Sequence, residues 1–271
     1  MYQDLYRNIL DSLCSITVYL DGHVLSEGSG FAISDDGAVL TAAHVITNRI
    51  PFVESDYTDP GMRIVVKFAN IDPIEYTVGV CGINIYVRPG SEAVQIDQAV
   101  IFPRTPLPTT LRSLTLGAGP HLGEELFFGG YSDELELPLG IGPLVATEAP
   151  DISLGLGVRR GHNSDITGPI IKRGVVGNLL NTVTQFDALS RQIECAIFYL
   201  DNGIHGGASG GPIVNRAGHA VGVIAQRATT SASQSSAIGL SVPSGATVGL
   251  SCMHTVNAMY QFLSARRSQP S

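Results

Sequence analysis

The sequence contains few charged residues and no long apolar run. Charged residues make up 15% of the 271 positions and hydrophobic residues 44%, so we expect a compact globular chain and not a disordered one. No stretch approaches the roughly 18 apolar residues that a membrane-spanning helix needs. The first residues also lack the basic and apolar regions of a signal peptide. We therefore expect a cytoplasmic protein with no membrane partner.

Cysteine is scarce and widely spaced. The four cysteines are Cys14, Cys81, Cys195 and Cys252, and no C-x-x-C pair occurs among them. This spacing indicates neither a zinc site nor a disulfide framework. We expect four buried thiols, no metal and no cofactor.

Acidic residues are missing from the last part of the chain. All 24 Asp and Glu residues lie at or before Asp201, whereas the segment after Ser209 contains only arginines as charged residues. The net charge is −8, which does not suit a protein that binds the phosphate backbone of nucleic acids. We expect no nucleic-acid partner, and the sequence leaves the oligomeric state open.

The most unusual stretch is Gly206–Pro212, GGASGGP, in which a serine has glycines on both sides. Glycine destabilises regular structure, so its density here indicates a special backbone conformation. A tight turn would expose the Ser209 hydroxyl and turn the N–H groups of Gly207 and Ser209 inward, as an oxyanion hole requires. A plain surface turn is the alternative that this stretch alone leaves open.

Two upstream segments supply the other groups that a serine nucleophile needs. Residues 31–34 and 38–44 predict a β-hairpin around an Asp-Gly turn, with His44 at the end of its second strand. Asp97 lies at the start of a short apolar run, where an unpaired carboxylate would be poorly solvated. We predict a triad in which His44 is the general base, Asp97 orients it and Ser209 is the nucleophile.

The glycine-rich stretch also satisfies G-x-S-x-G, the nucleophile elbow of α/β-hydrolases. That fold requires an acid and then a histidine after the serine, and no Asp or Glu follows Ser209. This residue inventory excludes the α/β-hydrolase interpretation.

Many short apolar runs separated by Gly and Pro predict an all-β protein built from barrels. Apolar residues at helical spacing predict a short helix at each end of the chain. We expect strands at 15–20, 31–34, 38–44, 63–69, 75–87 and from 97, and then at 125–128, 143–147, 168–176, 192–200, 212–215, 219–225 and 237–242. We divide the chain into residues 1–115 (opening helix and first barrel), 116–250 (second barrel with Ser209) and 251–271 (closing helix and tail).

Three segments carry a family resemblance: Gly28–Val45 (GSGFAISDDGAVLTAAHV), Asp97 with Ala99, and Gly207–Pro212. They resemble the motif blocks of chymotrypsin-like serine proteases, in the style of the bacterial high-temperature-requirement proteases without their C-terminal peptide-binding domain. The resemblance implies two six-stranded antiparallel Greek-key β-barrels. It also implies a protein or peptide substrate that is cleaved through an acyl-enzyme.

The resemblance further implies where a substrate binds. The expected substrate-binding residues are Ile204, His205, Gly206, Val223, Ile224, Ala225 and Gln226. Because these residues are mostly small or apolar, we expect a small or medium apolar side chain at P1. Asp201 could instead favour a basic P1 residue, but it lies where similar bacterial proteases carry a structural aspartate.

Position 208 departs from the digestive enzymes of this superfamily. Those enzymes carry an aspartate directly before the nucleophile, which pairs with a newly cleaved N-terminus, whereas this sequence has Ala208. We expect no activation by such an ion pair. The site is then either competent on folding or controlled by the order of its loops.

These observations predict a serine endopeptidase. Two alternatives stay open at this point: a catalytically silent protease-like module that binds a peptide or a partner, and an ester hydrolase on the same scaffold.

Overall fold

The computed structural model describes residues 2–86, 93–132, 168–186, 191–229 and 243–267. In these residues the elements are, in chain order, α1 (Gln3–Ser12), β1 (Leu13–Leu20), β2 (His23–Ala32), β3 (Val39–Thr41), α2 (Ala43–Thr47), α3 (Ser55–Thr58), β4 (Met62–Phe68), β5 (Ile74–Tyr86), β6 (Ala93–Pro103), β7 (Glu125–Gly130), β8 (Ile170–Phe186), β9 (Arg191–Leu200), β10 (Pro212–Val214), β11 (Ala220–Thr229), β12 (Pro243–Ser251) and α6 (Met253–Arg267).

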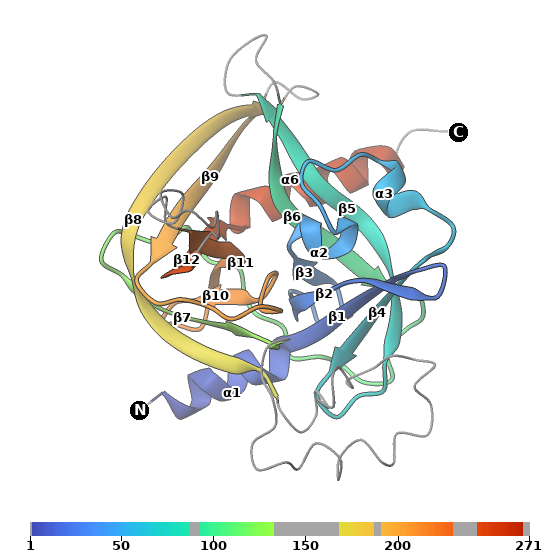
Figure 1. The fold of residues 1–271 in the computed structure, drawn as a ribbon, viewed down its shortest axis with the longest axis horizontal. Helices are drawn as coiled ribbons and strands as arrows, with labels where there is room; N and C mark the ends of the chain where they lie inside the picture. Colours follow the sequence, from blue (N-terminus) through green and yellow to red (C-terminus); the bar gives the residue numbers. More distant parts are fainter. Residues whose placement is uncertain (1, 87–92, 133–167, 187–190, 230–242, 268–271) are drawn as a thin grey trace, which may run out of the picture.

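The strands form two closed six-stranded antiparallel barrels, which confirms the predicted fold class (Figure 1). The first barrel has the order β4-β1-β2-β3-β6-β5 and closes by pairing β4 with β5. The second has the order β8-β7-β10-β11-β12-β9 and closes by pairing β8 with β9. Around each ring, the order is first, second, third, sixth, fifth and fourth strand. In both barrels the fourth strand returns beside the first, as in a Greek key.

Large side chains fill both barrels. Phe31, Phe68 and Tyr76 lie in the first core, and Phe128 and Phe198 lie in the second, all almost fully buried. Each such side chain contributes about 1.5–3 kcal/mol when it leaves water. The first apolar cluster also includes residues of β7 and β10, so the two barrels share an apolar interface.

The N-terminal helix lies against the second barrel, and the C-terminal helix contacts both barrels. In α1, Leu5 and Ile9 are buried, while the rings of Tyr2 and Tyr6 lie 4.9 and 5.8 Å from the ring of Phe127 in β7. Helix α6 packs on β5 and β6 of the first barrel and on β9 of the second. The division of the chain at residue 115 stays a prediction.

The sequence pattern does not predict β12. Its Gly249 leaves room for an aromatic ring, because a Cβ there would lie 2.6 Å from Cε2 of Phe198. A Cβ at Gly222 on the neighbouring β11 would lie 2.7 Å from Cζ of the same ring. Glycine counts against a strand in a sequence, yet here it lets two strands enclose a buried ring. The strands expected at 143–147 and 237–242 fall outside the described residues.

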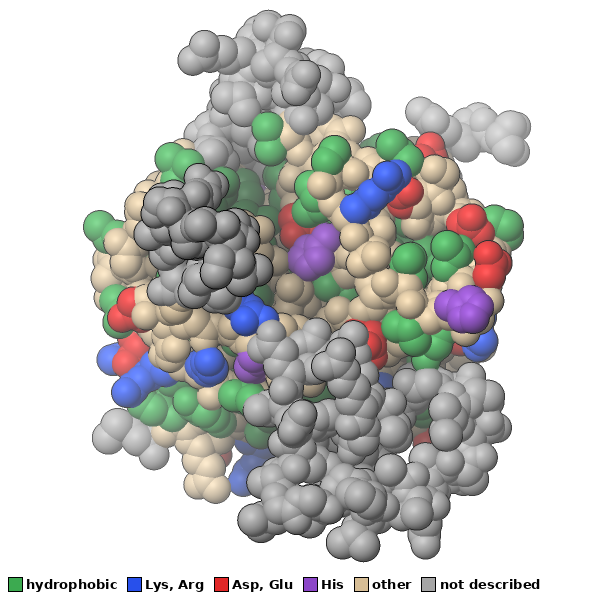
Figure 2. Space-filling view, in the orientation of Figure 1, with side chains coloured by type: hydrophobic (Ala, Val, Ile, Leu, Met, Phe, Trp, Pro, Cys, Tyr) green, Lys and Arg blue, Asp and Glu red, His purple; other side chains and the backbone are tan. Residues whose placement is uncertain are grey.

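The surface carries charges of both signs. On the face shown in Figure 2, Lys and Arg side chains are interspersed with Asp and Glu. Of the helices that the structure describes, none is long and apolar enough to cross a membrane.

Candidate active site

His44 lies in a short helix and not at the end of a strand, so that detail of the prediction is wrong. Strand β3 ends at Thr41, and His44 is the second residue of α2. No side chain of the segment itself caps this helix, but Oδ1 of Asp97 accepts a hydrogen bond from the His44 backbone N–H at 2.9 Å. A distant carboxylate therefore satisfies one of the free N–H groups at the start of α2.

Asp97 lies inside β6 and not at a strand start. The antiparallel register pairs Thr41 with Ala99, and continuing it by two residues places Asp97 opposite the first residue of α2. Sheet register thus brings a carboxylate to His44, although the two residues are 53 positions apart in the chain.

The two side chains are also bonded to each other. Nδ1 of His44 lies 2.7 Å from Oδ2 of Asp97. Because a carboxylate can only accept, Nδ1 carries the proton and Nε2 of the neutral ring keeps its lone pair. The Asp97 side chain is 11% exposed and the His44 side chain 30% exposed, so the imidazole is more open to solvent than the carboxylate.

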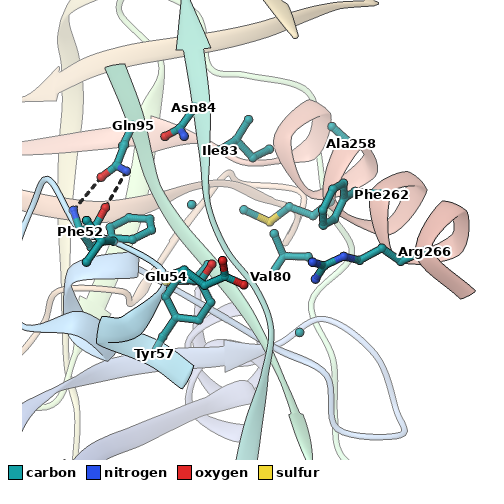
Figure 3. Close-up of a pocket in the computed structure, with 15 residues that line it drawn as sticks. Phe52, Glu54, Tyr57, Val80, Ile83, Asn84, Gln95, Ala258, Phe262 and Arg266 are labelled. Carbon is teal, nitrogen blue, oxygen red and sulfur yellow. Dashed lines mark hydrogen bonds between the residues drawn. The ribbon is translucent and has the colours of Figure 1, made fainter. Parts of the chain in front are cut away.

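A second link supports this pair. The backbone N–H of Phe52 donates to Oε1 of Gln95 at 2.8 Å, and Nε2 of Gln95 donates to the Phe52 carbonyl at 2.9 Å (Figure 3). Phe52 belongs to the loop after α2, and Gln95 precedes Asp97 by two residues in β6. These two hydrogen bonds, which we call the Phe52–Gln95 clamp, border a pocket of about 560 Å³ between β5 and α6. The clamp ties the segment that carries His44 to the strand that carries Asp97.

The serine lies in a tight turn, as its glycines predict. Gly207 and Gly210 have φ of +83° and +85°, in the left-handed region that favours glycine. The Gly211 N–H donates to the Ala208 carbonyl at 3.0 Å and closes the turn. The Ser209 carbonyl accepts from the Ser29 N–H of β2 at 2.8 Å. The turn is therefore bonded to the first barrel.

Two close approaches bring this turn to the segment that holds His44. A Cβ at Gly28 would lie 2.6 Å from Cγ2 of Val45 and 3.1 Å from the Ser209 carbonyl oxygen. A Cβ at Gly210 would lie 2.9 Å from the Ala42 backbone nitrogen. The structure thus places the turn of Ser209 directly against the start of α2, beside the His44–Asp97 pair.

Hydrogen bonds orient the peptide groups on both sides of Gly207. The Gly206 carbonyl lies 3.1 Å from Nδ1 of His205, and the Gly207 carbonyl accepts from the Ser29 hydroxyl at 2.8 Å. The N–H and C=O of a trans peptide point in opposite directions. The held Gly206 carbonyl therefore also fixes the Gly207 N–H, and the held Gly207 carbonyl fixes the Ala208 N–H. Toward the other described residues, the N–H groups of Gly207 and Ser209 make no hydrogen bond.

The expected substrate-binding residues occupy different environments. The side chains of Val223 and Ile224 are fully buried, and Ile204 is 5% exposed. The Ile224 backbone is already paired with Gly210 and Gly211 across the turn. Ala225 lies at a bulge in the β11–β12 pairing, and Gln226 is exposed.

Asp201 is tied to the protein backbone. Its Oδ1 accepts from the Val175 N–H at 2.7 Å, and its own N–H donates to the Val175 carbonyl at 3.1 Å. This carboxylate holds the loop before the nucleophile against β8, which is the behaviour of a structural aspartate.

All four cysteines are free and buried, as expected. Burial raises the pKa of Cys252 to about 12 and raises the pKa of the other three thiols as well. The described parts of the chain contain no cluster of three metal-ligating side chains.

The double barrel and the His–Asp pair beside a serine turn define a chymotrypsin-like fold. The sequence matches the trypsin-like peptidase domain over residues 28–223, and the chain belongs to that family. No curated protein sequence matched the chain.

Solved structures share the fold at low sequence identity. An inactive mutant form of Rv3671c from M. tuberculosis H37Rv aligns over 98% of this chain and 92% of its own, with 17% identity and a TM-score of 0.53. The active form of the Rv3671c protease from M. tuberculosis aligns over 94% and 82%, with 16% identity and a TM-score of 0.51. At these identities the likeness concerns the fold.

Proposed function

We propose that this chain is a serine endopeptidase with His44, Asp97 and Ser209 as its catalytic triad. Its family implies peptide or protein substrates. The observation that carries the proposal is the contact of 2.7 Å between Nδ1 of His44 and Oδ2 of Asp97, next to the turn of Ser209. This arrangement suits acyl transfer because, with the proton on Nδ1, Nε2 of His44 is left to accept the proton of the serine.

In the proposed reaction, Nε2 of His44 takes the proton of the Ser209 hydroxyl while Oγ bonds to the carbonyl carbon of the substrate. The N–H groups of Gly207 and Ser209 bind the resulting oxyanion, and the Asp97 carboxylate stabilises the imidazolium. His44 then gives its proton to the leaving amine as the C–N bond breaks. Water attacks the acyl-enzyme by the same steps and releases the free acid and Ser209.

We further propose that an extended peptide lies along β11 beyond Ile224. The backbone of Ala225 and Gln226 supplies hydrogen bonds to its main chain. Ile204, His205 and Gly206 form the opposite side of the P1 pocket, with Val223 and Ile224 behind them. The apolar character of this set favours a small or medium apolar P1 residue.

A fluorophosphonate probe and a peptide library test the triad. We expect the probe to label the wild type at Ser209, and Ser209→Ala to lose labelling and about 10⁴-fold in turnover. Ser113→Ala is the matched control, because Ser113 is a surface serine bonded to Asp35 in the first barrel. It keeps wild-type labelling and cleavage. Digestion of the library by the wild type also reports the P1 preference.

The outcomes separate the alternatives. Unchanged hydrolysis by purified Ser209→Ala contradicts the proposal. A folded wild type that neither reacts with the probe nor cleaves peptides is a binding module. Turnover of simple esters without any peptide cleavage identifies an ester hydrolase.

A further inference from the structure

Ser29 in β2 uses every polar group it has near the proposed nucleophile. Its N–H donates to the Ser209 carbonyl at 2.8 Å, and its hydroxyl donates to the Gly207 carbonyl at 2.8 Å. The hydroxyl oxygen accepts from the Tyr131 N–H at 2.8 Å, and the Ser29 carbonyl accepts from the Thr41 hydroxyl at 2.7 Å. The residue is fully buried. It therefore bonds the chain on both sides of position 208.

Position 208 itself supplies no polar anchor. Ala208 is fully buried and packs in the apolar core of the second barrel. Its backbone carbonyl is bonded to the Gly211 N–H, which fixes the peptide that carries the Ser209 N–H. The other proposed oxyanion donor, the Gly207 N–H, lies outside that local turn. Its direction depends on contacts to the two peptides that flank Gly207.

Glycine at 207 makes such contacts necessary. Without a Cβ, its backbone can adopt several conformations of similar energy, and only some turn the N–H toward the oxyanion. The His205 ring is a neighbour in the same loop and holds the Gly206 carbonyl. Ser29 is 178 residues away in the other barrel and holds the Gly207 carbonyl. Among these contacts, the one from Ser29 anchors the loop to a rigid strand.

We propose that Ser29 is a positioning residue for the oxyanion hole: its hydroxyl fixes the Gly207–Ala208 peptide, so that Gly207 keeps the backbone conformation, with φ of +83°, in which its own N–H in the preceding peptide faces the developing oxyanion. The bond is neutral on both sides and needs no free N-terminus. It supplies from the first barrel the anchor that Ala208 does not provide. This role rests on the proposed endopeptidase function.

The tight packing around the hydroxyl supports a fixed geometry. A Cβ at Gly130 in β7 would lie 2.6 Å from Oγ of Ser29, so the strand of the second barrel closes over the hydroxyl. The Tyr131 N–H directs the hydroxyl by donating to its oxygen, which leaves the hydroxyl proton for the Gly207 carbonyl. Two consecutive hydrogen bonds thus link Tyr131, which directly follows β7, through Ser29 of β2 to Gly207 in the turn.

Ser29→Ala tests the role, with Ser12→Ala as its control. Ser12 is also fully buried and donates one hydrogen bond to a backbone carbonyl, but it lies in α1. For Ser29→Ala we expect kcat to fall roughly tenfold to hundredfold, because misaligning an oxyanion donor loses part of its 10²–10³-fold effect. KM stays within about twofold, since the hydrogen bonds from the oxyanion hole to the substrate form in the transition state. The affinity for a peptide boronic acid, which forms a tetrahedral adduct, falls in parallel with kcat.

A purely structural serine gives a different result. In that case Ser29→Ala and Ser12→Ala lower the unfolding midpoint alike, and kcat and boronate affinity stay at wild-type values, which overturns the proposal. Ser29→Cys retains the approximate size of the side chain and a weak hydrogen-bond donor. It is the second variant, for the case that Ser29→Ala does not fold. An intermediate loss of kcat in Ser29→Cys supports the role, and an unchanged kcat overturns it.

The failure of the proposed function is seen separately. If Ser209→Ala cleaves peptides as the wild type does, the triad is wrong whatever Ser29 does. If Ser209→Ala is inactive while both folded Ser29 variants keep wild-type kcat, only the positioning role is wrong.

Discussion

The two barrels share one strand order but organise their polar groups differently. In the first barrel, His44 and Asp97 contact each other directly through their side chains, supported by the Phe52–Gln95 clamp in the same barrel. In the second barrel, the Ser209 turn is held by backbone hydrogen bonds, by glycines, and by Ser29 of the other barrel. The His–Asp pair is thus a property of one barrel, whereas the geometry of the nucleophile requires both.

The largest loss of stability is expected from Gly210→Ala, which disturbs the contact between the Ser209 turn and the first barrel. A Cβ at Gly210 would lie 2.1 Å from the Ser29 carbonyl oxygen and 2.2 Å from the Thr41 hydroxyl oxygen, at a φ of +85°. We expect a stability loss of about 2–5 kcal/mol, the sum of the left-handed backbone conformation and the overpacking. Urea unfolding measures the loss, and fluorophosphonate labelling reports whether the turn survives.

Gly22→Ala is the control for the backbone conformation alone. Gly22 has a φ of +82°, and a Cβ added there would meet no atom within 4 Å, so only the conformational part, about 1–2 kcal/mol, is expected. Equal losses in the two variants would contradict the claim that contact between the barrels shapes the turn.

A smaller effect is expected from Gln95→Ala, which removes the clamp from the His–Asp side. Two hydrogen bonds to the Phe52 backbone are lost, so we expect a destabilisation of about 1–3 kcal/mol. Peptide turnover should fall only several-fold, because the direct His44–Asp97 contact remains. The His44 Nδ1 proton signal in NMR reports on that contact. Gln3→Ala, on the exposed face of α1, is the control, and a turnover loss as large as that of Asp97→Ala would contradict the secondary role of the clamp.

At neutral pH the smallest effect is expected at Cys252, because its contribution appears only in alkaline solution. In the unfolded chain the Cys252 thiol ionises near its ordinary pKa of 9.0, whereas burial raises its pKa to about 12 in the native protein. The unfolded state therefore loses protons first, and native stability falls as pH rises from 9 to 12 while it is unaffected below 9. We expect Cys252→Ser to flatten this decline by up to about 1.4 kcal/mol per pH unit in urea unfolding. Parallel declines in the two proteins would show that this thiol stays accessible to solvent.

Much of the site follows from local sequence, and the exceptions have physical reasons. The glycines around Ser209 predict the turn because only glycine adopts its backbone angles without strain. The helix at His44 is not visible locally, because its cap comes from Asp97 through the register of β3 and β6. Strand β12 is missed because its glycines make room for Phe198, a neighbour in space from another strand.

Ser29 shows the same limit for function. It lies in the motif GSGF, and both flanking glycines are needed because a Cβ at either would overlap a neighbouring valine side chain. Serine between two sterically required glycines, in the buried half of β2, is the available signal. Its partners at Gly207 and Tyr131 are distant in sequence, so no spacing rule indicates them.

The Ser29–Gly207 bond has a consequence for how the protein is made. The first barrel, which contains both residues of the His–Asp pair, is synthesised long before the loop that Ser29 must hold. A nascent or truncated chain therefore lacks the proposed active site. The site is complete only when the second barrel has docked on the first. Such a late step would prevent an unfinished polypeptide from cleaving itself or its neighbours.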